Sequence, residues 1–173
     1  MIFMVSKDFL IDCTPQAKIG NTRYGLLRIK AGSHTLCDDG TMFDIDFGLS
    51  HLARLSVPGI ARYSLRFEGM SADAIADLFL DFIYGEYCNR LPERPVLGAL
   101  VRTSVFTAFN VEGFDSLFIA LVSRNEECDR FIWRKGRVSD TYEVELPAHA
   151  LAHAVKSCRS WLDDLPTETD EVS

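Results

Sequence analysis

Hydrophobic and polar residues alternate along the first part of the chain, which is the pattern of strands with one buried face. Phe9, Ile11 and Cys13 carry this alternation in the first such segment. Aliphatic and aromatic residues then fill 23–30, and a short turn of small and polar residues joins them to 34–37. We therefore predict a strand at 9–13 followed by a β-hairpin.

The spacing of hydrophobic residues changes to three and four after residue 44, which predicts a helix. Asp44 precedes this helix as a candidate N-cap, and its apolar face contains Ile45, Leu49, Leu52 and Leu55. A second helix is predicted between Ser71, which is placed to cap it, and Gly85. Its apolar face contains Ile75, Leu78, Phe79, Phe82 and Ile83.

The segment 117–122 is apolar at every position, which predicts a central strand covered on both faces. An alternating segment at 105–111 precedes it, and 131–133 begins a partner strand. In 142–146 apolar residues alternate strictly with polar ones, which predicts a strand with one solvated face. The second half of the chain is therefore expected to return to strands, with 117–122 at the centre of the sheet.

A last helix is predicted after that strand. We expect Pro147 to open it, because the missing N–H of proline costs nothing in the first turn of a helix. The buried face of this helix is expected to contain Leu151, Val155, Cys158 and Leu162.

Together these elements predict one α+β domain over residues 1–162, in which a largely antiparallel sheet is packed against about three α-helices. A chain of 173 residues is long enough to bury such a core without disulfides or metals. Prolines in the segment 85–102 exclude a regular helix or a central strand there, so this segment is expected to be an internal connection. Residues 163–173 contain five acidic and no basic residues, which predicts an acidic, flexible tail.

The formal net charge of −7 comes mainly from that tail, because the remaining residues contain 20 acidic against 18 basic side chains. No basic stripe is interleaved with aromatic residues, so a nucleic-acid partner is not expected. The apolar runs are too short to span a bilayer, and the first five residues lack the features of a signal peptide. The five cysteines are widely spaced and form no CxxC pair, which is typical of reduced thiols in a cytoplasmic protein.

Several residues resemble parts of catalytic or metal-binding patterns. His149 and His153 are four apart, but they lack the glutamate of the zinc-protease motif and lie off the buried face, so we predict two exposed helix histidines. His34 and Cys37 point to opposite faces of a strand. Cys128 is surrounded by acidic residues, which would raise its pKa and disfavour a thiolate. We therefore predict no enzyme activity, no metal and no cofactor.

Three features of the first half carry a resemblance: the opening Met1-Ile2-Phe3, the hairpin with an acidic turn at Asp38-Asp39, and the helix that begins near Asp44. In the second half it is carried by the segments 114–122, 130–134 and 142–147, which lead into a closing helix. In this order of elements the chain resembles immunity protein 42 of bacterial polymorphic-toxin systems. It departs from that pattern at Met4-Val5, where a Gly-Asp pair is expected.

The resemblance implies a cytoplasmic protein that binds a cognate toxin domain and neutralises it by covering its active site or locking it inactive. Acidic hairpin tips would steer association with a basic toxin, so the predicted partner-binding residues are Asp38, Asp39, Glu126, Glu127 and Asp129. Two other classes stay open. One is an enzyme or small-ligand-binding domain with a cleft between sheet and helices, lined by Tyr63, Trp133 or Tyr142. The other is an adaptor that works through an exposed apolar patch.

Overall fold

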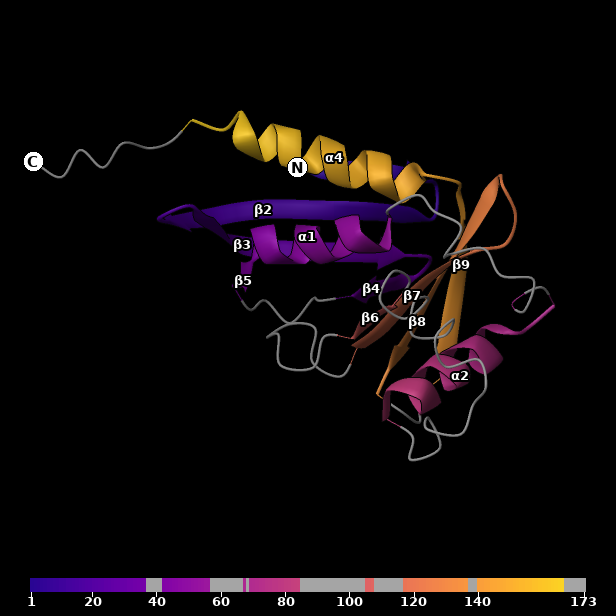
Figure 1. Cartoon of the computed structure of the whole chain (residues 1–173). Coiled ribbons are helices and arrows are strands. Elements are labelled where there is room, and N and C mark those ends of the chain that lie inside the picture. Colours follow the sequence, from indigo (N-terminus) through magenta and orange to yellow (C-terminus); the bar gives the residue numbers. More distant parts are fainter. Residues whose placement is uncertain are drawn as a thin grey trace, which may run out of the picture.

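The computed structural model describes residues 1–36, 42–56, 67, 69–84, 105–107, 117–136 and 140–166. These residues form two antiparallel sheets and three α-helices (Figure 1). The predicted α+β fold with antiparallel strands and three helices is confirmed, and the strands are divided between two sheets. The predicted connection at 85–102 and residues 167–173 of the predicted tail lie outside the described residues.

The first sheet has the order β1-β2-β3-β4, with β5 also paired to β3. Its strands are β1 (Ile2–Ser6), β2 (Phe9–Ile19), β3 (Thr22–Ala31), β4 (His34–Leu36) and β5 (Phe43–Asp44). The predicted strand and hairpin are confirmed, but β2 is longer than expected. It continues beyond Cys13 because a bulge between Pro15 and Ala17 absorbs the break in the alternating pattern.

The second sheet has the order β6-β7-β8-β9. Its strands are β6 (Val105–Thr107), β7 (Leu117–Ser123), β8 (Cys128–Lys135) and β9 (Thr141–Pro147). The prediction that 117–122 forms an interior strand covered on both faces is confirmed, since β7 lies between β6 and β8 and its residues 117–122 are all buried.

The three described helices are α1 (Ile45–Leu55), α2 (Ala72–Tyr84) and α4 (Ala150–Asp163). Both predicted N-caps are confirmed. The Asp44 carboxylate accepts a hydrogen bond of 2.8 Å from the Phe47 N–H, and the Ser71 hydroxyl accepts one of 3.2 Å from the Ala74 N–H. None of the described helices is both long and apolar enough to cross a membrane.

The prediction that Pro147 opens the last helix was wrong. Pro147 is the last residue of β9 and is paired with Cys128, while α4 begins three residues later. The reason is that β9 is the last strand in the order of its sheet, where a missing N–H is tolerated. His149, with φ of 65°, turns the chain from the strand into the helix.

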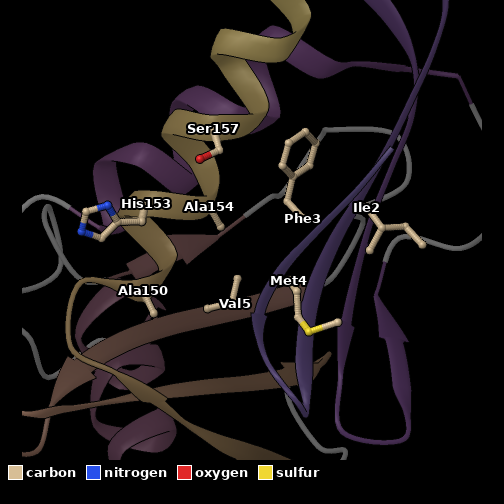
Figure 2. Close-up of a pocket in the computed structure, with 8 residues that line it drawn as sticks. All are labelled: Ile2, Phe3, Met4, Val5, Ala150, His153, Ala154 and Ser157. Carbon is tan, nitrogen blue, oxygen red and sulfur yellow. The ribbon is translucent and has the colours of Figure 1, made fainter.

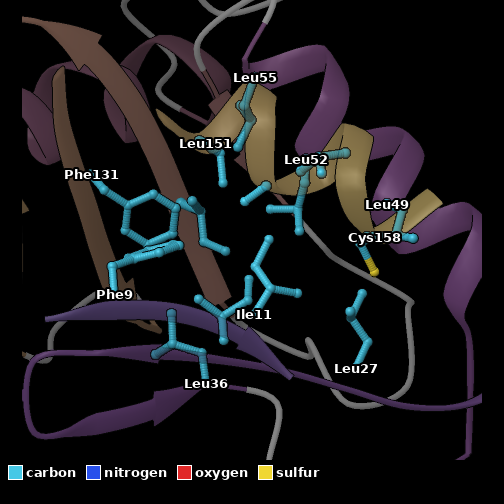
Figure 3. Packing of buried hydrophobic residues seen from close by; sticks show 14 of the residues in the cluster. Phe9, Ile11, Leu27, Leu36, Leu49, Leu52, Leu55, Phe131, Leu151 and Cys158 are labelled. Carbon is cyan, nitrogen blue, oxygen red and sulfur yellow. The ribbon is translucent and has the colours of Figure 1, made fainter. Parts of the chain in front are cut away.

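The larger hydrophobic cluster joins the two sheets through α1 and α4 (Figure 3). Phe9 of β2 meets Phe131 of β8 edge to face, with ring centroids 4.7 Å apart. α1 contacts β3 and α4, and α4 contacts β1. Burial of the predicted apolar faces of these two helices therefore covers the first sheet and fixes the second against it.

α2 lies against the opposite face of the second sheet (Figure 1), and a second hydrophobic cluster forms between them. Ile75 and Phe79 of α2 pack there with Phe118 of β7 and Ile132 of β8. Along 117–122, odd-numbered residues of β7 belong to the larger cluster and even-numbered residues belong to this second cluster. β7 therefore lies between the two hydrophobic clusters and contributes side chains to both.

Candidate functional site

A groove of about 380 Å³ lies between β1 and the first half of α4 (Figure 2). Four consecutive residues of β1 form one wall and four residues of α4 form the other. The lining residues are Ile2, Phe3, Met4, Val5, Ala150, His153, Ala154 and Ser157. The groove therefore joins segments that are about 150 residues apart in the chain.

Backbone geometry leaves part of β1 free on the groove side. The Cys13 N–H donates to the Met1 carbonyl oxygen at 2.9 Å, and the Met1 nitrogen donates to the Cys13 carbonyl oxygen at 2.8 Å. In an antiparallel pair such bonded positions alternate with unbonded ones. The N–H and C=O groups of Ile2 and Met4 therefore point away from β2, outward from the edge of the sheet.

The side chains of β1 are divided between the core and the solvent. Phe3 points toward α4 (Figure 2), and its ring centroid lies 5.7 Å from that of Trp161. Val5 packs against the larger cluster. Ile2 and Met4 are 59% and 73% exposed. Proteins usually protect an edge strand with a charged residue or a proline, and Ile2–Val5 contains neither.

Negative charge is absent from both walls of the groove. His153 is the one titratable side chain among the lining residues, and exposed Lys156 follows it one turn later on α4. No acidic residue occurs in α4 before Asp163, or in β1. The groove is therefore neutral to positive, although the whole chain has a net charge of −7.

Two of the predicted partner-binding residues, Glu126 and Glu127, are exposed at the turn between β7 and β8. Hydrogen bonds order this turn: the Glu127 N–H donates to Asn125 Oδ1 at 2.9 Å, and the Arg124 N–H donates to the Cys128 carbonyl oxygen at 2.9 Å. The turn therefore presents two carboxylates to solvent on a fixed backbone.

Asp129 differs from the other predicted partner-binding residues, because it is only 3% exposed. Its Oδ1 accepts a hydrogen bond of 2.6 Å from the Ser123 hydroxyl on the neighbouring strand. The expectation that Asp129 projects from the hairpin tip is therefore wrong, since its side chain points into the protein from β8. Asp38 and Asp39 lie outside the described residues.

The histidines and cysteines lie close to where the sequence places them. His149 and His153 are both exposed, as predicted, but His149 precedes the helix rather than lying within it. Burial and the nearby Glu145 carboxylate raise the pKa of Cys128, so the predicted direction is right although burial is the main cause. Within the described ranges, no group of three or more His, Cys, Asp or Glu side chains is arranged to hold a metal.

Two buried arginines of β8 were not identified from the sequence. Arg130 donates to both carboxylate oxygens of Glu143, at 2.7 and 2.8 Å, and to the Met70 carbonyl oxygen at 3.0 Å. Arg134 donates to Thr141 Oγ1 at 2.7 Å and also binds Asp73 and Asp77 of α2. Opposite charges on the facing strands were the signal for the pair of Arg130 with Glu143. The ion pairs of Arg134 fasten α2 to the sheet.

The aromatic residues suggested for a ligand cleft pack against one another. Trp133 is buried and stacks on Tyr142, with ring centroids 5.6 Å apart. His34 contacts both rings, at 5.7 Å and 4.1 Å. Trp133 is therefore part of the core between the sheets, and Tyr63 lies outside the described residues.

No family model matches the chain, and no curated protein matches its sequence. Its fold is similar to the crystal structure of CdiI from Burkholderia dolosa AUO158, with a TM-score of 0.64 and 16% sequence identity. The match covers 88% of this chain and 94% of that chain. The two proteins therefore share an architecture over nearly their whole lengths.

Proposed function

We propose that this chain is an immunity protein, which binds a cognate bacterial toxin domain and neutralises it by covering its active site or locking it inactive. The observation that carries the proposal is the similarity of fold to CdiI, an immunity protein of contact-dependent growth inhibition. The order of elements favours the immunity protein 42 family of polymorphic-toxin systems, and the proposed location is the cytoplasm.

An immunity protein needs a preorganised surface, because ordering flexible groups on binding reduces affinity. Two described surfaces fit this requirement. The turn with Glu126 and Glu127 is held by its own hydrogen bonds, and the groove between β1 and α4 rests on the larger core. Neither surface needs a catalytic group in order to inhibit a toxin.

Co-expression tests the proposal. The C-terminal domain of a toxin encoded by the adjacent gene is produced in bacteria with or without this chain, and growth is measured. We expect the chain to restore growth and to co-purify with the toxin domain as a stable complex. The control is an unrelated toxin domain of similar toxicity, which the chain should not neutralise. Loss of growth in both cases, with no complex, would contradict the proposal for that pair.

A further inference from the structure

We propose that the groove between β1 and α4 is where the toxin docks, through an extended strand that adds to the free edge of β1 and places an acidic side chain beside His153 and Lys156. The inference rests on the proposed immunity function and specifies the binding surface and the chemistry of the segment that occupies it.

The backbone of β1 defines the shape of the occupant. The N–H and C=O groups of Ile2 and Met4 point away from β2 in the plane of the sheet. The edge of β1 therefore offers two hydrogen-bond donors and two acceptors in one row. An added strand satisfies such a row with its own main chain, whereas a helix has no free backbone groups along its side. An extended segment is therefore the complementary partner.

Exposed side chains on β1 supply apolar contacts for that strand. Ile2 and Met4 have exposed fractions of 59% and 73%, and they lie on the face of β1 opposite to Phe3. Cross-strand neighbours on one face of a sheet contact each other directly. Apolar residues at alternate positions of the added strand would cover Ile2 and Met4, while the residues between them face α4.

The charge of the groove walls indicates which side chains the added strand should place toward α4. The wall formed by α4 offers His153, and exposed Lys156 follows it one turn later on the helix. None of the lining residues is acidic. An Asp or Glu side chain on the added strand would meet favourable charge there, whereas a Lys or Arg would not. The expected occupant is therefore an apolar strand that contains at least one acidic residue.

A second copy of this chain is the less suitable occupant. The bulge between Met4 and Ser6 limits regular pairing to the first few residues of β1. Two such short edges offer few residues to an interface, whereas a stable protein contact requires roughly 1,000 Å² of buried surface. A toxin domain supplies further surface beyond its docking strand, and the resulting contact can reach that size.

Proline at Met4 tests the strand addition. Its N–H points out of the sheet, so Met4→Pro removes a donor for the added strand and no ladder bond within the fold. With the toxin domain of the adjacent gene as the probe, we expect Met4→Pro to weaken binding at least tenfold. The conservative variant Met4→Leu keeps the N–H and an apolar side chain, so it should bind the toxin domain more tightly than Met4→Pro does.

Charge reversal tests the second element of the proposal. We expect Lys156→Glu to weaken binding of the toxin domain severalfold, with a larger effect at low salt. Lys18→Glu introduces the same change at an exposed position near the far end of β2 and should leave binding unchanged.

Hydrogen exchange of the complex provides a measurement that does not depend on any variant. The Ile2 and Met4 amides should exchange more slowly in the complex than in the free chain. Unchanged exchange there, or tight binding by a folded Met4→Pro variant, would overturn the groove as the docking site and leave the proposed function intact. If the unmodified chain neither binds nor neutralises the toxin domain, the proposed function fails with it. A dimer that Met4→Pro converts to a monomer would instead assign the edge to a second copy and overturn the inference.

Discussion

Arg134 of β8 donates a hydrogen bond of 2.6 Å from Nη1 to Oδ1 of Asp77 on α2, and so joins two elements that are 57 residues apart. The arginine side chain is 6% exposed, whereas that of Asp77 is 61% exposed. The charge that must be satisfied is therefore the buried guanidinium, because the carboxylate can be hydrated without it.

Replacing that guanidinium is expected to loosen α2. Arg134→Met should lower the free energy of unfolding by about 2 kcal/mol, because the hydrogen bonds to Thr141 and to the α2 carboxylates are lost. Chemical denaturation measures the change, and amide exchange should become faster in α2 than in α1. Arg124→Met removes the exposed pair with Glu145 and should cost less than about 0.5 kcal/mol. Equal costs for the two variants would contradict this assignment.

The ion pair of Arg23 with Asp46 predicts a dependence of stability on acid. Partial burial would raise the pKa of Asp46, but hydrogen bonds from the Arg23 side chain and backbone outweigh it and hold the pKa below its ordinary value of 3.8. A carboxylate with a lowered pKa stabilises the fold above that ordinary value, and this contribution is lost as the pH falls through the pKa of the folded state.

Asp46→Asn should therefore destabilise the protein by about 1 kcal/mol at pH 7. The difference from the unmodified chain should shrink below about pH 4, where the carboxylate becomes protonated. Urea denaturation of the variant and the unmodified chain, from about pH 7 to below about pH 4, measures how this difference in stability changes. Asp8→Asn is the control, since Asp8 pairs only at 3.9 Å with a highly exposed Lys7, and a constant difference for Asp46→Asn at all pH values would refute the linkage.

The N-cap of α1 is expected to contribute measurably to stability. Asp44→Ala removes the acceptor for the Phe47 N–H and should cost about 1 kcal/mol. Asp44→Ser supplies a hydroxyl acceptor in place of the carboxylate and should restore most of that loss. Thermal unfolding of the two variants gives the comparison, and identical melting temperatures would argue against the cap.

Gly25 is predicted to resist substitution because of the backbone that it faces. A Cβ atom at this position would lie 2.8 Å from the Cα of Pro15 on the neighbouring strand, at the bulge in β2. Gly25→Ala should therefore destabilise the protein by about 2 kcal/mol, since backbone atoms must shift to admit the methyl group. Gly20→Ala meets no neighbouring atom and tests the separate cost of the φ of 61°.

Variants in and beside the turn between β7 and β8 should distinguish an effect on toxin binding from an effect on stability. Glu126→Lys combined with Glu127→Lys should leave stability within about 0.5 kcal/mol, since both side chains are exposed. If this tip steers the toxin domain, the association rate should fall about tenfold. Asp129→Ala should instead cost about 1–3 kcal/mol, because the Ser123 hydroxyl loses a buried acceptor. Stopped-flow binding and denaturation distinguish the two outcomes.

Local features of the fold were predictable because their signals lie within a few residues. Asp44 and Ser71 act as the caps that their positions indicated, and β7 is covered on both faces as its unbroken apolar run implied. The pattern of alternation predicts strands without stating which strands pair, so the division into two sheets did not follow from it. The prediction that Pro147 opens the last helix was wrong for a similar reason. A proline is tolerated in β9 because that strand is the last in its sheet.

Features of the candidate site depend on contacts between distant segments. The groove is formed by β1 and α4, and taken separately the two segments indicate only a short apolar run and an amphipathic helix. Asp129 follows Glu126 and Glu127 in an acidic run, and only the register of β8 places it inside the protein. Asp163, the first residue of the predicted tail, is instead the last residue of α4 and binds Arg23 at 2.9 Å.

The alternation of β7 between two cores has a consequence for protein engineering. Its odd-numbered side chains belong to the cluster that contains residues of α1 and α4, and its even-numbered side chains belong to the cluster that contains residues of α2. A designer could therefore exchange α2 for a helix of different sequence by changing the even positions of β7 and the residues of β8 and β9 that contact α2. The side that carries the groove would keep its packing, so that recognition and this part of the scaffold could be varied independently.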